Sequence, residues 1–383
     1  MNHPIIAPPA TLALLGGGQL GRFFVHAAHE LGYKVIVLDP DPDAPAGKVA
    51  DQHIIANYDD PTALTQLSQL CAAATTEFEN VPAAVLEQLA QTMPVSPSAD
   101  AVSIAQDRIR EKAFLHNNGF NTAPFIAVEN ENDLDAASDG LFPAILKTAR
   151  FGYDGKGQAR VTTIEEAKTA QRKFNLPCVL ERMLPLDLEV SVVLARSACG
   201  QCHCFPLAEN KHSNGILDVT VVPARTTPAL QQQAEQMASE LAARLGYVGI
   251  LTVEFFISDG QLLINEIAPR PHNSGHYTID GCVTSQYEQQ LRALCGLPLG
   301  SASLHSHSVM VNLLGDLWFQ NSSKSCEPDW PLLNQIPNLK LHLYGKTSAR
   351  IARKMGHFTV IDQEGDAAVA TAMAARKAIG IPD

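Results

Sequence analysis

The sequence predicts an α/β protein made of two or three packed domains. Its 383 residues exceed what one core usually holds, at roughly 100 to 200 residues per domain. Short apolar runs alternate with helical stretches over about the first 105 residues, which favours a parallel sheet flanked by helices. With 46% hydrophobic and 18% charged residues, the chain has enough apolar material for buried cores.

Composition excludes some classes of partner. The chain carries 28 Lys and Arg against 40 Asp and Glu, a net charge of −12, so it repels polyanions and we expect no nucleic-acid partner. A local basic pocket for one phosphate remains compatible with this charge. No uncharged apolar stretch approaches the roughly 20 residues needed to cross a bilayer, and the first residues lack a basic secretory segment. We therefore expect no membrane contact and a cytoplasmic location.

The chain opens with a βαβ pattern. The predicted elements are a strand at 12–15, a glycine turn at 16–21, a helix at 23–32, a strand at 34–39 and a helix at 61–71. A helix at 106–118 and a strand at 142–147 begin a second unit. The segment 296–306, rich in Leu, Pro, Gly and Ser, is typical of a linker, and a small strand-rich unit follows it. The predicted domains are 1–105, 106–298 and 299–383.

The eight cysteines give no disulfide framework in a chain of this size, and we interpret most of them as buried free thiols. Cys199, Cys202, His203 and Cys204 resemble half of a zinc knuckle, but no second pair at metal-ligand spacing completes it. Because strand-like runs flank the segment, a hairpin turn is the favoured interpretation.

The first glycine turn, Gly16 to Gly21, fits G-x-G-x-x-G between a strand and a helix, and Asp39 ends the next strand. One interpretation is a dinucleotide site, with Asp39 on the ribose. Backbone N–H groups at a helix start attract any phosphate, however. A third possibility is that the glycines serve only strand-to-helix packing.

A second glycine loop, residues 152–158, follows the strand that ends in Lys147 and contains Lys156. Such a loop can fold over a polyphosphate while Lys147 neutralises charge from the strand. It is not a Walker A sequence, because no Lys-Ser/Thr pair follows the glycines.

Two apolar strands around Ser-Asp-Gly predict a hairpin at 250–267. For a turn centred on Gly260, Glu254 opposes Glu266. Like charges directly opposite each other destabilise a sheet, so the pair predicts a counter-ion, and carboxylate oxygens suit Mg²⁺ that bridges nucleotide phosphates. A register slip of one residue would separate the two carboxylates.

Three further segments carry polar groups. In the loop at 268–276, Arg270 can hold a bicarbonate or phosphate, and His272 can move a proton near neutral pH. The segment 181–189 offers backbone groups to an adenine and a carboxylate to ribose hydroxyls. Lys346, Arg350, Arg353 and Lys354 concentrate positive charge near the C-terminus, which is usually a solvated patch.

Together these motifs resemble the ATP-grasp carboxylases of purine synthesis, in particular the 5-(carboxyamino)imidazole ribonucleotide synthases. The resemblance spans nearly the whole chain, and it rests on residues 14–22, 76–81, 152–158, 209–216, 265–276, 344–346 and 353–357. It implies an ATP-grasp fold with an N-terminal Rossmann-like (pre-ATP-grasp) domain, a mobile lid at about 120–185 and a small strand-rich C-terminal domain. It also implies a homodimer.

The implied enzyme is an ADP-forming ligase that joins bicarbonate to 5-aminoimidazole ribonucleotide through carboxyphosphate, with ATP and Mg²⁺ or Mn²⁺ as cofactors. The resemblance implies that Glu254 and Glu266 bind the metal and that Arg270, His272 and Asp154 are catalytic. The implied ATP contacts are Arg108, Lys147, Gly152, Tyr153, Asp154, Gly155, Lys156, Gly157, Gln158, Glu181, Arg182, Met183, Leu184, Glu189, His212, Asn265 and Glu266. The implied ribonucleotide contacts are Gln19, Tyr153, Asp154, Arg270, His272, Asn273, Ser274, Lys346 and Arg353.

Three other functions remain open at this point. An NAD-dependent oxidoreductase would use the first glycine turn, another ATP-grasp ligase or carboxylase would use the same metal pair, and a nucleotide-binding regulator would show no turnover. The Glu254 and Glu266 pair favours the ATP-grasp enzymes over the oxidoreductase, because hydride transfer needs no such metal site.

Overall fold

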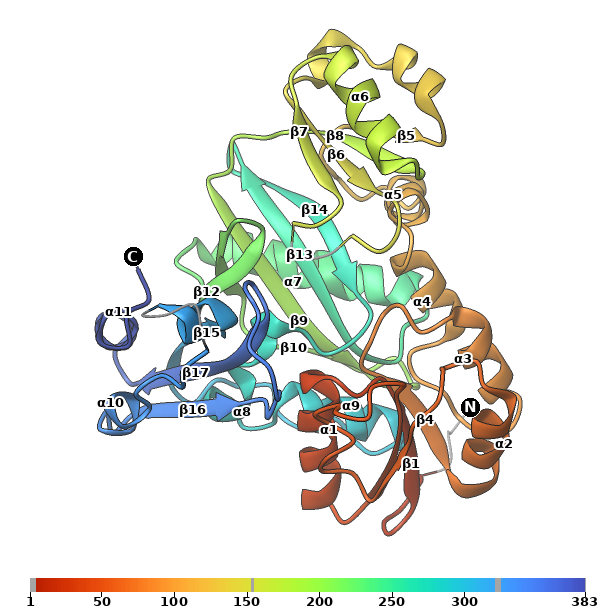
Figure 1. Cartoon of the computed structure of the whole chain (residues 1–383), viewed down its shortest axis with the longest axis vertical. Helices are drawn as coiled ribbons and strands as arrows, with labels where there is room; N and C mark the ends of the chain where they lie inside the picture. The colour runs from red at the N-terminus through yellow and green to blue at the C-terminus, as the bar shows by residue number, and fades with distance from the viewer. Residues whose placement is uncertain (1–4, 153–154, 321–324, 383) are drawn as a thin grey trace.

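The computed structural model describes residues 5–152, 155–320 and 325–382, and in this part of the chain three sheets organise the fold (Figure 1). The first sheet is parallel, in the order β3-β2-β1-β4. Its strands are β1 (Thr11–Leu15), β2 (Lys34–Leu38), β3 (Gln52–Ile54) and β4 (Ala73–Thr76), and the helices of this unit are α1 (Gln19–Glu30), α2 (Pro61–Leu70), α3 (Ala83–Leu89) and α4 (Ala99–Ala105). Alternate residues of β1 enter different cores on the two faces of the sheet.

Helix α1 begins at Gln19, so the predicted start at residue 23 was wrong. Gly16, with φ of +99°, makes the turn, and the extended residue Gly18 is the N-cap. Gly21 therefore lies inside the helix. A Cβ there would come within 3.0 Å of the Gly16 carbonyl oxygen and of Leu14, so this glycine allows close packing of helix on strand.

The second sheet has nine strands and runs from the middle of the chain into the C-terminal unit, in the order β14-β13-β9-β11-β12-β15-β17-β16 with β10 beside β9. The strands are β9 (Leu188–Arg196), β10 (Cys202–Cys204), β11 (Ala208–Ser213), β12 (Ile216–Val222), β13 (Gly249–Ser258), β14 (Gln261–Ala268), β15 (His307–Leu314), β16 (Leu339–Leu343) and β17 (Lys354–Asp362). Antiparallel pairing of β12 with β15 makes the junction. The described strands of the C-terminal unit therefore all extend the middle sheet.

Helices from distant parts of the chain cover these sheets. Helix α7 (Pro228–Arg244) supplies apolar residues to the core beneath β9, β13 and β14, and α11 (Gly365–Ala378) packs on β15 and β17. Helix α9 (Gln286–Leu294) packs with α1 against the N-terminal sheet. The remaining short helices are η3 (Asn273–Gly275), α8 (Thr278–Gly281), η4 (Gly315–Phe319) and α10 (Pro331–Asn334).

The third sheet forms a separate lobe at the top of Figure 1, in the order β5-β8-β6-β7. Its elements are β5 (Phe125–Val128), η1 (Glu131–Ala136), η2 (Asp139–Leu141), β6 (Ala144–Thr148), β7 (Gln158–Val161), α6 (Ile164–Phe174) and β8 (Cys178–Arg182), and α5 (Arg108–Asn117) precedes it. The lobe has its own apolar core. It coincides with the predicted lid at about 120–185, whose mobility stays a prediction.

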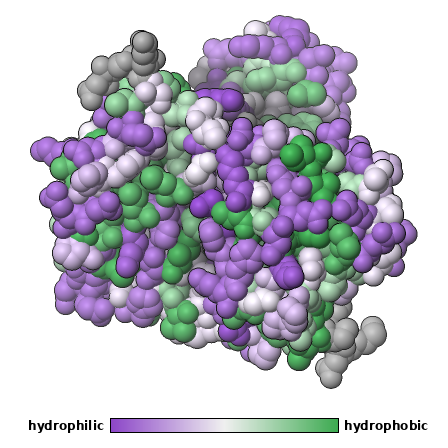
Figure 2. All heavy atoms as spheres, turned by 60° about the horizontal axis from the view of Figure 1, so that its bottom comes forward, coloured by the Kyte–Doolittle hydropathy of each residue, from purple (hydrophilic) through white to green (hydrophobic). Residues whose placement is uncertain are grey.

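Two further predictions concern the segment 199–204 and membrane-spanning helices. The segment 199–204 forms the predicted hairpin, because β10 returns antiparallel along β9. Among the described residues, no helix combines the length and apolar character needed to cross a membrane. On the face shown in Figure 2, hydrophilic and hydrophobic residues are interspersed.

Candidate active site

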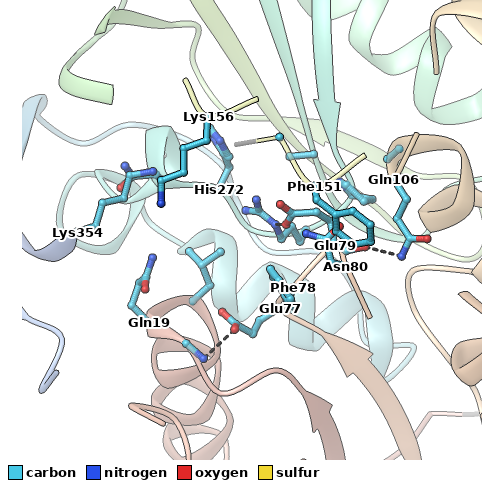
Figure 3. Close-up of a pocket in the computed structure, with 18 of the residues that line it drawn as sticks. Gln19, Glu77, Phe78, Glu79, Asn80, Gln106, Phe151, Lys156, His272 and Lys354 are labelled. Carbon is cyan, nitrogen blue, oxygen red and sulfur yellow. Dashed lines mark hydrogen bonds and ion pairs between the residues drawn. The ribbon is translucent and has the colours of Figure 1, made fainter. Parts of the chain in front are cut away.

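A cleft of 670 Å³ lies where the three predicted domains meet (Figure 3). The N-terminal unit contributes the glycine turn and residues 77–80, the middle unit contributes α5, the second glycine loop and the end of β14, and the C-terminal unit contributes residues 346 and 350–354. The predicted site residues that line the cleft are Gln19, Arg108, Gly152, Lys156, Glu266, Arg270, His272, Asn273, Lys346 and Arg353. Residues from three distant segments thus meet in one cavity.

The first glycine turn is closed by two carboxylates. The N–H of Gly17 donates to Asp39 Oδ2 at 2.6 Å, and the N–H groups of Gly18 and Gly21 donate to Glu77 Oε1 and Oε2 at 2.7 and 3.0 Å. These backbone donors are the ones that a dinucleotide pyrophosphate would need. The geometry therefore tells against a nicotinamide cofactor here, and Asp39 binds the turn itself.

Glu254 on β13 faces Glu266 on β14, as predicted, but for a different reason. The turn consists of Asp259 and Gly260, with φ of +49° and +70°, so it is centred half a residue before Gly260. A bulge between residues 264 and 266 then inserts Asn265 and restores the pairing of Glu254 with Glu266. Such a bulge sets two consecutive residues, here Asn265 and Glu266, against one.

This hairpin has the electrostatics of a cation site. Burial and the nearby Glu266 raise the pKa of Glu254 to about 7. Arg108 Nη2 lies 3.3 Å from Glu266 Oε2, and His272 Nε2 lies 3.4 Å from Glu254 Oε1. Asn265 Oδ1 is buried and has no hydrogen-bond partner in the described structure. Since the described residues form no cluster of three or more His, Cys, Asp or Glu suited to a metal, a cation here would need further oxygen ligands from substrate.

A buried ion cluster connects the separate lobe to this hairpin. Glu181 on β8 lies 2.9 Å from Lys147 Nζ and 2.7 Å from Lys112 Nζ, and Lys112 also donates to the Asn265 carbonyl at 3.0 Å. Burial alone raises the pKa of Glu181, but Lys147 and Lys112 outweigh it and hold the pKa at about 2. Sequence reasoning missed Lys112. Its position four residues after Arg108, on the same helix face, was the available signal.

The predicted adenine and ribose segment lies at the end of β8. Arg182 and Met183 have exposed side chains, while their N–H groups donate to the Pro124 and Pro143 carbonyls. Farther along, Glu189 Oε2 lies 2.6 Å from His212 Nδ1. Burial, the largest single influence, lowers the pKa of His212, but Glu189, Glu254 and Glu266 together outweigh it and the pKa is raised.

Some side chains of the loop after β14 line the cleft, and others lie behind them and support them. Arg270 forms an ion pair with Glu79, a residue that sequence reasoning gave no role. Ser274 is fully buried, and its hydroxyl bonds His272 Nδ1 at 2.9 Å, so it lies behind His272. Both polar side-chain atoms of Asn273 are buried without a partner among the described residues, which indicates a place for a polar ligand.

Basic residues from the C-terminal unit close one side of the cleft. Lys346 Nζ donates to the Lys354 carbonyl at 2.7 Å and lies over the Tyr344 ring. Arg353 donates to the Ser348 carbonyl at 2.7 Å. Figure 3 shows Lys354 on the same side of the cleft as Lys156 and His272. The patch that usually signals a solvated surface therefore faces the cavity.

Two predicted residues, Tyr153 and Asp154, lie outside the described residues. Their neighbours Gly155 and Gly157 have φ of +75° and +69°, which glycine adopts without strain. A Cβ on Gly157 would lie 2.5 Å from Thr148 Oγ1. This part of the loop therefore requires glycine.

Three domain families match consecutive parts of the chain. Residues 10–106 match the ribonucleotide synthetase preATP-grasp domain, residues 113–287 match the ATP-grasp domain, and residues 308–371 match the phosphoribosylaminoimidazole carboxylase C-terminal domain.

Relatives of known function match along nearly the full length. The N5-carboxyaminoimidazole ribonucleotide synthase of Bacillus subtilis is 44% identical over 96% of this chain and 95% of its own, and that of Brucella melitensis is 43% identical over 94% and 99%. A crystal structure of an N5-carboxyaminoimidazole ribonucleotide synthetase with ADP has a TM-score of 0.90 at 40% identity, covering 97% of this chain and 98% of that one. An Aspergillus clavatus structure with ADP and 5-aminoimidazole ribonucleotide has a TM-score of 0.87 at 29% identity, with the same coverage.

Proposed function

The chain belongs to the N5-carboxyaminoimidazole ribonucleotide synthases, and on that premise we propose how its residues divide the work. It is an ADP-forming ligase with the ATP-grasp fold, and it carboxylates 5-aminoimidazole ribonucleotide in purine biosynthesis. The observation that carries the assignment of roles is the Glu254 and Glu266 pair beside a cleft lined by all three units.

We propose that ATP lies between the separate lobe and β14. Lys147 and the loop at 152–158 neutralise the phosphates, while residues 181–184 and Glu189 hold adenine and ribose. Bicarbonate then attacks the γ-phosphate. The new P–O bond forms as the bond to ADP breaks, and this gives carboxyphosphate. Its breakdown to CO₂ and phosphate leaves the carbon to be captured by the amine, and both steps require exclusion of water.

The residues present fit a divalent cation. Two carboxylates face each other here, and burial together with Glu266 raises the pKa of Glu254. With the buried Asn265 oxygen, which has no partner among the described residues, they suit a hard cation with oxygen ligands. We propose that Glu254 and Glu266 hold Mg²⁺ or Mn²⁺, which would neutralise charge on the phosphates of ATP. Arg108, which contacts Glu266, would orient that carboxylate.

For the ribonucleotide we propose a phosphate site formed by Lys346 and Arg353, with Gln19 at the start of α1. Asn273, whose amide has no partner in the described part of the chain, and Arg270 would hold the base and the carboxyl donor near His272, and Ser274 would orient His272. The predicted contacts of Tyr153 and Asp154 belong to the same site. The homodimer and the cytoplasmic location stay predictions.

Phosphate release from ATP tests the assignment. With purified protein and Mg²⁺, we expect release to require bicarbonate and to rise strongly when 5-aminoimidazole ribonucleotide is added. The rate of phosphate release could instead be independent of bicarbonate and of the ribonucleotide but increase with another amine or carboxylate acceptor. That result would assign the cleft to a different ATP-grasp reaction.

A further inference from the structure

Cys202 and Cys204 form a pair of thiols on one face of β10, outside the cleft. Residues two apart on a strand face the same side, and this pair lies opposite Arg196 and Leu194 on β9. Both sulfur atoms approach one hydroxyl on α7, because Cys204 Sγ lies 3.3 Å and Cys202 Sγ 3.7 Å from Ser239 Oγ. The two thiols therefore converge on one point.

The two thiols shift each other's pKa in opposite directions. A hydrogen bond from Cys204, the largest influence, lowers the pKa of Cys202 to about 6, and Ser239 and Arg196 act in the same direction. The bond to Cys202, together with burial, raises the pKa of Cys204. The thiolate is the form of cysteine that binds metals.

Cys204 can be reached from solvent. Cys202 and Cys204 are half-buried, and an open groove of 530 Å³ reaches Cys204. None of the residues that line this groove lines the cleft.

We propose that Cys202 and Cys204 form a two-thiolate binding site for a soft monovalent metal ion, of which Cu(I) is the type. Thiolate ligands select Cu(I). A structural zinc site takes four protein ligands. Zinc is therefore the poorer fit, because the described residues form no cluster of three or more His, Cys, Asp or Glu suited to a metal. Binding of the ion displaces the protons of the thiols to solvent and changes no oxidation state. The competing role is apolar packing, since both cysteines contact the core beneath β9.

Competition with bicinchoninate under anaerobic conditions tests the site, with Cu(I) as the probe. We expect the wild-type chain to withdraw one Cu(I) tightly. Cys202→Ser and Cys204→Ser should each weaken binding by roughly 100-fold or more, because loss of a ligand costs at least as much as loss of an outer-shell partner. Cys199→Ser and Cys326→Ser remove exposed thiols and serve as matched controls that keep the tight site.

ATP-dependent carboxylation should be unchanged in all four variants without copper, which verifies their folding. If a variant fails to fold, X-ray absorption spectroscopy of the copper-loaded wild-type chain serves as the test instead. We then expect two sulfur atoms bound to the copper. The proposal is overturned if the double variant Cys202→Ser/Cys204→Ser still binds Cu(I) tightly, or if Cys199→Ser abolishes tight binding. It is also overturned if X-ray absorption finds only nitrogen and oxygen ligands around the copper.

Discussion

Glu254 lies directly opposite Glu266 across the β13 and β14 strands, and the bulge at Asn265 sets this pairing. If the ladder continued from the turn at Asp259 and Gly260 without a bulge, Asn265 would lie opposite Glu254. With it, Asn265 and Glu266 are both set against Glu254, so that one short segment offers a carbonyl-type oxygen and a carboxylate.

Glu266→Gln should lower ATP turnover by roughly 100-fold or more while the fold stays intact, because a carboxylate that neutralises charge at the phosphates is lost. ADP formation at saturating Mg²⁺ and circular dichroism measure the two effects. Glu87→Gln, on an exposed helix position, is the matched control. Near-normal turnover of Glu266→Gln would remove Glu266 from the metal site.

Arg353→Ala should raise the KM for the ribonucleotide by roughly 10-fold or more and leave the KM for ATP nearly unchanged, as expected for a charged hydrogen bond to its phosphate. Steady-state kinetics with each substrate varied in turn provide the comparison. Arg244→Ala, an exposed arginine paired with Glu240, should change neither KM. Equal effects on both substrates would contradict the assignment.

Lys112→Ala should destabilise the protein by about 3 kcal/mol, because it breaks a buried ion cluster and leaves Glu181 with one partner. Lys112 also holds the Asn265 carbonyl, so ATP affinity should fall as well. Urea unfolding and nucleotide titration measure the two effects. Lys173→Ala, at an exposed position, should change neither stability nor ATP affinity. If Lys112→Ala also changed neither, the cluster would not connect the lobe to the hairpin.

A buried histidine stack predicts the response to acid. The rings of His276 and His357 stack at 4.5 Å, and those of His357 and His342 at 4.6 Å. The Nδ1 atoms of His276 and His357 bond the hydroxyls of Tyr287 and Tyr344. Burial holds the pKa of His276 and of His357 well below the usual value.

In the unfolded chain these histidines titrate near pH 6.5, so below about that pH the unfolded state binds more protons. The free energy of unfolding should then fall on acidification, by about 1.4 kcal/mol per pH unit for each of the two groups. His357→Gln should lower the slope by about 1.4 kcal/mol per pH unit in urea titrations, and the exposed His305→Gln should not. An unchanged slope in His357→Gln would show that other groups set the acid response.

Local patterns in the sequence predicted much of the fold. The strand at 12–15 and the helix at 61–71 lie within a residue or so of their observed bounds, because hydrophobic periodicity and capping residues act over short distances. The start of α1 was misplaced because Gly21 was interpreted as part of the turn, although it serves close packing.

Contacts between distant segments could not be predicted in the same way. The binding of Glu77 to the glycine turn joins residues 59 positions apart in the chain, and the pair of Glu79 with Arg270 spans 191 positions. Neither leaves a local pattern. The basic patch near the C-terminus was likewise ambiguous, because only the tertiary fold turns it toward the cleft.

The continuous ladder from β14 to β16 also limits how the chain can be divided. If residues from β15 onward were removed, β12 would lose its neighbour and present unpaired N–H and C=O groups, a template for association with other chains. The segment that bears Lys346 and Arg353 is thus tied through backbone hydrogen bonds to the strands that bear the two carboxylates. We therefore expect that the C-terminal unit cannot be removed or exchanged without disturbing the strands that bear the two carboxylates.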